Sequence, residues 1–314
     1  MDNLLTIFRA LTDPTRIRIL LLLHEMELSI GEIAQILGQS QPRVSRHVKV
    51  LVEASLVVRR KEGSWVFLHL GAKERVEPLF SALDSWDKEK SWRNSDLARL
   101  NAVRADRAAA ATRYFKSHAA EWDAIRSMHV AESEVEQAIV AMAGDKSLGR
   151  LVDIGTGTGR MLELLGSKAD SMIGLDRSPE MLRIARTKLE NKNLSHMSLC
   201  QGDMYALPLK DNSADFVILH QVLHYAQQPS LAIDEAARVL DKDGQLMIID
   251  FASHDKEELR INNAHVRLGF SDEQISECFS AAGLLMKDVR QLKGGALTVK
   301  LWIATRSDSV SGKN

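Results

Sequence analysis

A glycine-rich turn after a short apolar run constrains the fold of this chain more than any other feature of its 314 residues. The run 151–154 reads L-V-D-I, and glycines follow at alternate positions, Gly155, Gly157 and Gly159. Apolar residues at helical spacing begin directly afterwards, at Met161. Glycine permits a positive φ and leaves no Cβ beside a ligand, and a helix N-terminus offers free N–H groups. The pattern predicts a buried strand that passes to a helix across a bound ligand.

The glycine spacing and two later acidic residues indicate the class of ligand. G-x-G-x-G is not the dinucleotide fingerprint G-x-G-x-x-G, and this departure favours a smaller nucleoside. A second apolar run, 171–175, ends at Asp176, and a carboxylate at the tip of a second strand can accept both ribose hydroxyls. A third run, 197–200, precedes Asp203, whose carboxylate can accept the exocyclic amine of adenine.

Regularly spaced apolar runs predict an α/β domain in the second half of the chain. Strands are expected near 150–154, 171–176, 197–201, 214–220, 244–251, 284–291 and 297–306. Helices are expected to alternate with the first five of these strands. This order predicts a doubly wound, Rossmann-like, mostly parallel sheet of seven strands with helices on both faces. The ligand is expected at the carboxyl ends of the first strands.

Four separated motifs resemble, in order, those of class I S-adenosylmethionine-dependent methyltransferases. They read D-I-G-T-G-T-G, L-D-R-S-P-E-M-L, Q-G-D-M-Y-A-L-P and D-K-D-G-Q-L, and the resemblance covers about residues 131–306. It implies S-adenosylmethionine or S-adenosylhomocysteine as the bound nucleoside, and a seventh strand antiparallel to the others. A glycine loop in some other α/β domain is the alternative, which the placement of Asp176 and Asp203 disfavours.

The resemblance also assigns residues to the ligand. The glycine turn would lie close to the methionine part, and Asp176 would meet the ribose. Adenine would contact Met181, Asp203 and Met204, while His220 would lie near the transferred methyl group. The expected cofactor-binding residues are Asp153, Gly155, Thr156, Gly157, Gly159, Asp176, Met181, Asp203, Met204 and His220.

No catalytic signature in the chain fixes a methyl acceptor, so the catalytic residues stay unknown. The candidates are His220, His224 and Tyr225. His224 fits an acceptor pocket and a surface helix position equally well, and His254 is a weaker pocket candidate. Enzymes of the resembled class that methylate DNA bases usually carry an N/D-P-P-Y/F-type motif after the fourth strand. This chain has H-Q-V-L there, and it lacks the clustered cysteines expected for arsenite methylation.

The first seventy residues predict a helix-turn-helix. Asp13, with proline directly after it, is a helix start signal. Ser29 is expected to cap a helix over 30–37, and Ser40 can cap another over 41–54. Two helices around a four-residue turn, with a polar face on the second, are typical of this DNA-binding motif.

The second of these helices and a hairpin after it carry the candidate DNA contacts. The hairpin is expected over 56–68, with three basic residues at its tip as a wing. Side chains of a recognition helix can reach base edges, and wing cations can contact phosphates. A solvated polar helix and a charged turn are the alternative. The expected DNA-binding residues are Gln41, Arg43, Ser45, Arg46, His47, Lys49, Arg59, Arg60 and Lys61.

Residues 4–70 resemble the ArsR-type winged-helix repressors. The resemblance rests on F-R-A-L-T-D-P-T-R-I-R-I-L, S-Q-P-R-V-S-R-H-V-K-V-L and the wing. It implies a homodimer on palindromic operator DNA. Many members sense metals through a cysteine pair in the helix before the turn, but the matching segment 27–32 has no cysteine. We therefore expect no metal at that site and a different signal.

The expected domain organisation has four parts. They are a winged-helix DNA-binding and dimerisation domain at 1–92, a helical linker at 93–130, the methyltransferase-like domain at 131–306 and a flexible tail at 307–314. Helices are expected over 74–92 and 97–124. The first either joins a dimer interface or packs within its own domain. Tyr114 and Trp122 either lie over the cofactor or pack simply in a core.

Composition limits the remaining possibilities. The net charge of −1 does not mark the whole chain as a nucleic-acid binder. Cys200 and Cys278 are the only cysteines, which excludes a disulfide framework and a cysteine zinc cluster. No apolar run approaches the ~20 residues needed to span a bilayer. Arg16 and Arg18 interrupt the apolar residues near the N-terminus before any signal-peptide core forms, so the expected location is the cytoplasm.

These features favour a transcriptional regulator, expected to be a repressor. Its winged helix would bind operator DNA, and its second domain would bind S-adenosylmethionine or S-adenosylhomocysteine as a small-molecule nucleoside effector in methionine-cycle control. The alternative is an active methyltransferase that acts on a small molecule and carries an attached DNA-binding domain. A DNA-modifying enzyme targeted by the winged helix is a third hypothesis, which the missing DNA-methylation motif disfavours.

Overall fold

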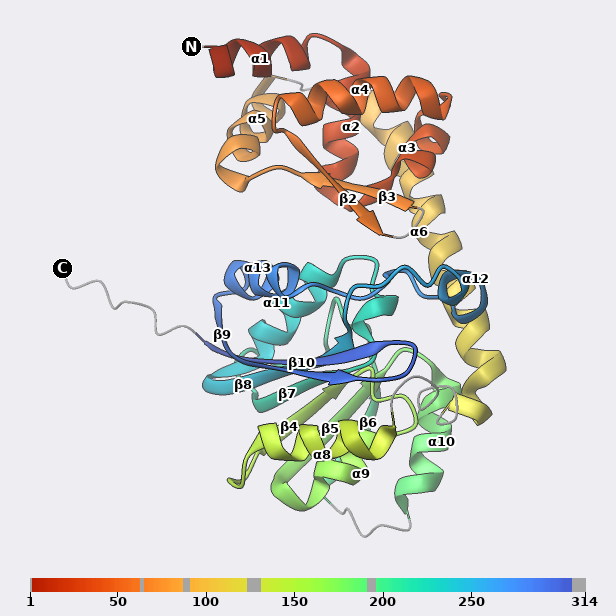
Figure 1. Ribbon diagram of the computed structural model, residues 1–314, viewed down its shortest axis with the longest axis vertical. Coiled ribbons are helices and arrows are strands. Elements are labelled where there is room, and N and C mark those ends of the chain that lie inside the picture. Colours follow the sequence, from red (N-terminus) through yellow and green to blue (C-terminus); the bar gives the residue numbers. More distant parts are fainter. Residues whose placement is uncertain (1, 63–64, 87–90, 123–130, 191–195, 307–314) are drawn as a thin grey trace, which may run out of the picture. The chain divides into compact units, whose positions relative to one another are not determined.

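The chain folds into two compact units. Figure 1 shows the computed structural model, which describes residues 2–62, 65–86, 91–122, 131–190 and 196–306. The units are Met1–Ala110 and Ala111–Asn314, and the division falls inside helix α6 (Ser91–His118). The expected tail, 307–314, lies outside the described residues. Within the described ranges, no helix has both the length and the apolar character required to cross a membrane.

The first unit is a winged helix-turn-helix. Its elements before α6 are α1 (Asp2–Leu11), α2 (Pro14–Glu25), β1 (Leu28–Ser29), α3 (Ile30–Leu37), α4 (Gln41–Glu53), β2 (Val57–Glu62), β3 (Trp65–Leu70) and α5 (Lys73–Trp86). The strands form an antiparallel sheet in the order β1-β3-β2. The apolar faces of the helices and the sheet enclose one core.

Local signals fix the helix ends, and the expected helix starts after Asp13 and Ser29 are confirmed. The Asp13 carboxylate accepts the Thr15 N–H at 2.8 Å and starts α2. The Ser29 hydroxyl accepts the Glu32 N–H, and the Glu32 carboxylate accepts the Ser29 N–H, which makes a capping box at the start of α3. Gly38 ends α3 with φ +64°, a left-handed conformation that suits glycine.

The predicted bounds of the next two helices are wrong. The helix expected over 74–92 ends at Trp86, and Trp92 belongs to α6, which begins six residues earlier than expected. Residues 87–90, which separate the two helices, lie outside the described residues. Leu100 and Val103, in the range expected as a linker, are buried in the core of the first unit.

The second unit has the predicted seven-stranded sheet. After the 3₁₀ turn η1 (Ala119–Glu121), its helices and other 3₁₀ turns are α8 (Glu132–Ala143), α9 (Arg160–Leu165), η2 (Gly166–Lys168), α10 (Pro179–Glu190), η3 (Leu223–Tyr225), α11 (Pro229–Val239), α12 (Glu258–Asn263) and α13 (Asp272–Ala281). Its strands are β4 (Gly149–Ile154), β5 (Ala169–Asp176), β6 (Met197–Gln201), β7 (Ala214–His220), β8 (Leu240–Phe251), β9 (Leu284–Lys293) and β10 (Thr298–Arg306). The strand order is β6-β5-β4-β7-β8-β10-β9, and β10 is antiparallel to both neighbours, as expected of the seventh strand.

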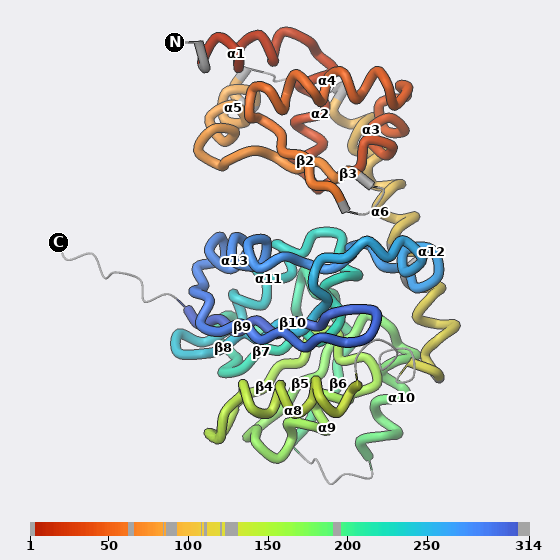
Figure 2. The backbone as a smooth tube through the Cα atoms, in the orientation of Figure 1, coloured from red at the N-terminus to blue at the C-terminus, as the bar shows by residue number. Residues whose placement is uncertain are grey.

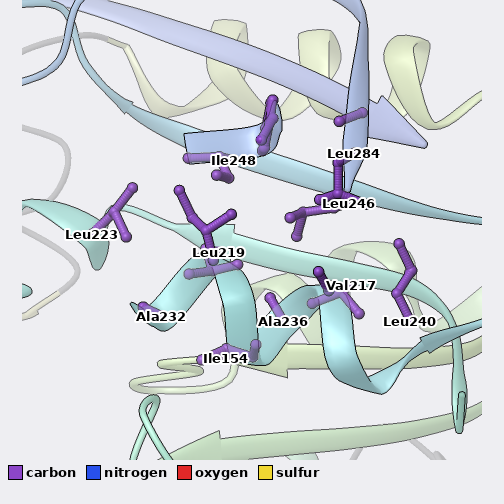
Figure 3. Packing of buried hydrophobic residues seen from close by; sticks show 14 of the residues in the cluster. Ile154, Val217, Leu219, Leu223, Ala232, Ala236, Leu240, Leu246, Ile248 and Leu284 are labelled. Carbon is purple, nitrogen blue, oxygen red and sulfur yellow. The ribbon is translucent and has the colours of Figure 1, made fainter. Parts of the chain in front are cut away.

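Helices cover both faces of this sheet, as predicted. Figure 2 shows α8 and α9 on one side and α11 and α13 on the other. Neighbouring residues of β7 point to opposite faces. Phe216 and Ile218 therefore join one core cluster, and Val217 and Leu219 join the other. In Figure 3, Val217 and Leu219 lie beside Ala236 of α11 in the second of these clusters.

One predicted alternation of strand and helix is wrong. Residues 202–213, between β6 and β7, contain no helix. This segment includes Gly202 and Pro208, and Asn212 adopts a positive φ of 55°. Glycine and proline are poor helix formers, and the left-handed conformation at Asn212 interrupts a helix. The connection therefore crosses from β6 to β7 as turns.

A half-buried ion pair ties α2 to α6 inside the first unit. Both Arg18 Nε and Nη2 donate to the Asp96 carboxylate at 2.6 Å. The Asp96 side chain is buried, while that of Arg18 keeps partial access to solvent. The exposed pair of Lys49 and Glu53, with Nζ 4.0 Å from Oε1, offers a comparison within the same unit.

We predict that Arg18→Met lowers the unfolding free energy of the first unit by roughly 2–3 kcal/mol. The value lies between the ~0–1 kcal/mol of exposed pairs and the ~3–5 kcal/mol for breaking a buried pair, because Asp96 keeps its charge without its cation. Lys49→Met should change the same quantity by less than ~0.5 kcal/mol. Amide hydrogen exchange of α2 and α3 in the full chain measures both. An equal loss of unfolding free energy in the two variants would contradict the stabilising role of the Arg18–Asp96 pair.

Candidate functional site

Helix α4 presents a polar face opposite a buried one. Val44, Val48 and Leu51 are buried in the core of the first unit. Ser40 occupies the N-cap position of α4, although its side chain makes no capping hydrogen bond. Four of the expected DNA-binding side chains of α4 are exposed: Gln41, Arg43, Arg46 and Lys49.

The other two expected contacts of α4 are less accessible. Ser45 and His47 are both half-buried. The Nδ1 atom of His47 lies 3.9 Å from Oδ2 of Asp13, the residue that caps α2. His47 therefore turns toward the neighbouring helix start and does not face outward as expected.

The basic residues of the wing lie along a strand. Arg59, Arg60 and Lys61 belong to β2, so the expected position at the hairpin tip is wrong. The strand continues to Glu62, which pairs with Trp65 of β3 and moves the turn further along the chain. The tip residues, 63–64, lie outside the described part of the chain. The pairing of β2 with β3 therefore determines the directions of the Arg59, Arg60 and Lys61 side chains.

The three wing cations differ in their partners. Arg59 and Lys61 are exposed. Arg60 is half-buried and forms an ion pair with Glu27, which precedes α3. This pair fastens β2 to the helix-turn-helix, so Arg60 has a structural partner that the sequence did not reveal.

The segment 27–32, which matches the metal-sensing site of the resembled family, forms ion pairs with two arginines. Glu27 pairs with Arg60, and Glu32 pairs with Arg107 of α6. Within the ranges that the structure describes, no three His, Cys, Asp or Glu side chains are grouped so that they could hold a metal ion.

The glycine turn follows β4 at the carboxyl edge of the sheet. Gly155 has φ +74° and Gly157 has φ +54°, a region that side chains rarely adopt. A Cβ on Gly155 would lie 2.4 Å from Cγ2 of Val222, which is far too close. A Cβ on Gly157 would meet Nε1 of Trp122 at 3.4 Å. Both glycines are therefore required by conformation, and Gly155 also by space.

Asp176 binds this turn with its carboxylate. Oδ2 accepts the Gly157 N–H at 2.8 Å, and Oδ1 accepts the Ser178 N–H at 2.7 Å. Burial raises the pKa of the Asp176 carboxyl above its ordinary value, while the N–H groups of Ser178 and Gly157 offset part of the rise. The sequence-predicted acidic residue therefore lies beside the turn, at the end of β5.

A further hydrogen bond lies inside the turn. The Thr156 hydroxyl donates to Oδ2 of Asp153 at 2.6 Å, and both side chains are buried. Asp153 and Thr156 thus support the turn from within. Of the expected adenine contacts, Asp203 accepts the Tyr205 N–H at 3.1 Å, directly after β6.

The two methionines expected at the adenine differ in burial. Met181 is buried in a cluster with Tyr114, Ala119 and Trp122. Met204 is half-buried and packs against the core cluster that includes α11. Tyr114 and Trp122, which were expected either over the cofactor or in a core, both pack in this cluster. Trp122 packs there and also lies beside Gly157 of the turn. Residues 123–130, which follow it, are outside the described part.

His220 and His224 lie at and after the end of β7. His220 is the last residue of the strand and is buried. Gln221 follows with φ +50°, an uncommon conformation for a residue with a side chain. His224 lies in η3 and is 2% exposed, so the alternative of a surface helix position is excluded.

His224 forms a buried pair with Asp250, near the end of β8. Its Nδ1 lies 2.7 Å from Oδ1 of Asp250, and its backbone N–H donates to Oδ2 at 3.1 Å. Burial raises the pKa of the neighbouring Tyr225 well above its ordinary value, and the charges of Tyr114 and Asp250 add to this. The arrangement fixes the orientation of the His224 ring.

Sequence reasoning missed three residues of this cluster. Asp250 is fully buried, the His265 ring centroid lies 4.2 Å from that of His224, and Arg267 donates to the Gln227 carbonyl at 2.7 Å. An aspartate inside the apolar run I-I-D-F was the one available signal. A lone acidic residue in a buried strand needs a partner.

The weaker candidate His254 lies after β8. Its Nδ1 accepts the Lys256 N–H at 3.2 Å, and its ring centroid is 6.1 Å from that of Phe251. The structure therefore places it at the edge of the aromatic group around His224, which also includes Phe251.

Comparisons with known proteins match the two units separately. The model of the bacterial regulatory protein arsR family matches residues 13–58, and a methyltransferase domain model matches residues 152–248. The arsenical resistance operon repressor of Escherichia coli is 43% identical over 88 residues, which are 28% of this chain and 70% of the repressor. The uncharacterized methyltransferase YcgJ of Bacillus subtilis is 28% identical over 120 residues, 38% of this chain and 47% of that protein.

Solved structures support the fold of the second unit. A chain from the complex between the Haloferax volcanii Trm112 methyltransferase activator and a methyltransferase has a TM-score of 0.55 and 20% identity. The match covers 64% of this chain and all of that chain. The chain spans less than half the length of the first curated relatives that it matches. From these matches and the two folds, the chain belongs to the arsR family of bacterial regulatory proteins and carries a class I methyltransferase domain after its winged helix.

Proposed function

We propose that the chain is a repressor whose methyltransferase domain binds S-adenosylmethionine or S-adenosylhomocysteine as an effector, in control of the methionine cycle. The observation that carries the proposal is the glycine turn bound by Asp176, in a chain whose other unit is a winged helix. Asp176 would accept the ribose hydroxyls, and the turn would lie against the methionine part. Asp203 would accept the adenine amine. Operator DNA would meet the exposed side chains of α4 and the wing.

The fit between these residues and the nucleoside rests on chemistry that the site already displays. The Asp176 carboxylate accepts two N–H groups, so it is an acceptor aimed at the turn. Gly157 brings the backbone close to the Asp176 carboxylate, and it has no Cβ that would obstruct a ligand there. When bound, the cofactor would supply an activated methyl group or its demethylated form, and the protein would distinguish the two at the end of β7.

A homodimer on palindromic DNA is part of the proposal. Helix α1 exposes three large apolar side chains: Leu4 by 54%, Leu5 by 47% and Phe8 by 56%. Clustered exposed apolar residues are typical of surfaces that bind another chain. A twofold dimer would present α4 twice, one helical turn of DNA apart or a multiple of it.

An effector acts only if it binds one conformation of the dimer better than the other. We expect one of the two ligands to change operator affinity by about tenfold, equivalent to ~1.4 kcal/mol of coupling. Operator binding by the purified full chain, titrated separately with S-adenosylmethionine and S-adenosylhomocysteine at fixed salt, measures this. Operator affinity that is indifferent to both ligands would reject effector sensing.

We predict that Arg43→Ala and Arg46→Ala each weaken operator binding by ~1–3 kcal/mol, because a lost base contact costs this much. Binding of the nucleoside ligand should stay unchanged, since neither arginine belongs to the second unit. Arg186→Ala, an exposed arginine on α10, is the matched control for lost charge. Fluorescence anisotropy with labelled operator reads the first effect, and calorimetry with ligand the second. Parallel loss of both activities would indicate misfolding.

An active small-molecule methyltransferase is the second candidate function. The His224–Asp250 pair favours it, because a histidine just after β7 whose orientation is fixed by a carboxylate of β8 is suited to proton transfer. Methyl transfer needs an aligned acceptor lone pair and sometimes a base. Labelled product from S-adenosylmethionine and a metabolite extract would support this candidate.

We predict that Asp176→Ala abolishes ligand binding, and with it any turnover, while operator binding without ligand persists. Asp176→Asn should weaken ligand binding less, since one acceptor oxygen remains. Because the pKa of Asp176 is raised, acidification should protonate it at a higher pH than an ordinary aspartate. Ligand affinity should therefore fall as the pH decreases toward that pKa. Calorimetry over a pH series, with Asp176→Asn as the reference, checks the order and the sign.

A further inference from the structure

Helix α6 contacts α3, the first helix of the helix-turn-helix, near both ends of α3. Near the start of α3, Nε of Arg107 donates to Oε1 of Glu32 at 2.7 Å, and Nη2 donates to the same oxygen. Near its end, Nη1 of Arg99 donates to the Ile36 carbonyl at 2.9 Å. The Arg107 and Glu32 side chains are only 14% and 15% exposed. Salt screens such a pair less than a surface pair.

The partner of Arg107 also belongs to the capping box of α3. Oε2 of Glu32 accepts both the N–H and the hydroxyl of Ser29 at 2.8 Å. Helix α3 packs directly against α4, and a Cβ on Gly31 would lie 3.3 Å from Nε2 of Gln41. Movement of Arg107 would therefore act on the start of α3 and through it on the helix with the exposed basic face.

The C-terminal part of the same helix belongs to the surroundings of the glycine turn in the second unit. The Tyr114 hydroxyl accepts from Nδ2 of Asn263 at 2.9 Å. The Phe115 ring lies edge-on to Trp122, with centroids 5.3 Å apart. Trp122 lies beside Gly157, so a ligand at the turn must either contact or displace it.

We propose that α6 couples ligand at the glycine turn to the helix-turn-helix, with the Arg107–Glu32 ion pair as its contact on the DNA-binding side. The inference rests on the proposed function, because it needs a ligand that changes operator affinity. Arg107 and Tyr114 are seven residues apart on one continuous helix, about two turns. Coupling requires an element whose equilibrium both sites bias, and α6 has a set of contacts in each unit.

Three single variants of the full chain and one double variant, Arg107→Met with Glu32→Gln, test the coupling. Arg107→Met removes the cation, and Glu32→Gln removes its partner while keeping a glutamine suited to the capping box. Arg113→Met is the matched control, because Arg113 is exposed on the same helix. The measured quantity is the ratio of operator dissociation constants with and without S-adenosylmethionine, and again with S-adenosylhomocysteine.

We expect a wild-type ratio of about tenfold or more for one ligand, and the same ratio for Arg113→Met. In Arg107→Met and Glu32→Gln it should fall to within about twofold, although each variant still binds the ligand in calorimetry. The double variant should lose no more than either single variant, since both changes break one contact. Ligand should also change the hydrogen exchange of α3 in the wild type and not in Arg107→Met.

The outcomes separate this inference from the function on which it rests. If the wild type responds to ligand and Arg107→Met and Glu32→Gln respond equally well, coupling through this pair is wrong and the sensor function stands. If the wild type binds both ligands and its operator affinity ignores them, the sensor function fails and the inference fails with it. If only Arg107→Met misfolds, Glu32→Gln decides.

Discussion

The hydrogen bond from the Gly157 N–H to Asp176 is the contact on which the candidate ligand site depends. It joins the turn after β4 to the end of β5, so the carboxyl ends of two neighbouring strands keep a fixed relation. On the other side of the turn, Val222 fills the space that a side chain on Gly155 would need. The backbone is therefore fixed between β5 and the segment after β7. Trp122 packs beside this fixed surface, which makes its position sensitive to whatever the turn binds.

The strands and the helix starts could be predicted because each depends on a short local pattern in the sequence. Apolar runs located all seven strands of the large sheet, and short signals such as the Ser29 cap located the helix starts. The division between α5 and α6 escaped prediction because apolar residues at helical spacing lie both before Trp86 and after Ser91. The missing helix between β6 and β7 reflects turn-forming residues such as Gly202 and Pro208, whose effect outweighed the usual alternation of strand and helix. These errors fall where two local preferences compete.

Residues of the candidate site were predictable only where their place at the end of a single strand identifies them. Asp176 and Asp203 lie at strand ends and so are found from the sequence. Asp250 is different, because it reaches His224 across 26 positions of sequence and only the pairing of β7 with β8 brings them together. Charged side chains raise the same difficulty. Arg60 is expected to be a wing cation at the DNA, but it forms an ion pair with Glu27, which lies 33 positions away in the sequence.

Regulation and catalysis make different demands on one set of contacts. Asp176 would hold the nucleoside in either case, so its loss cannot distinguish them. A sensor needs an element that responds to the ligand and also belongs to the DNA-binding unit. Helix α6 is continuous from one unit into the other and would be that element. An enzyme needs an acceptor to reach the methyl group, yet His224 is 2% exposed and its Nδ1 is engaged by Asp250. A histidine so enclosed meets an acceptor only if the aromatic residues over it move. Under the proposed function, a nucleoside at the turn would act alone, whereas turnover would also require these aromatic residues to move.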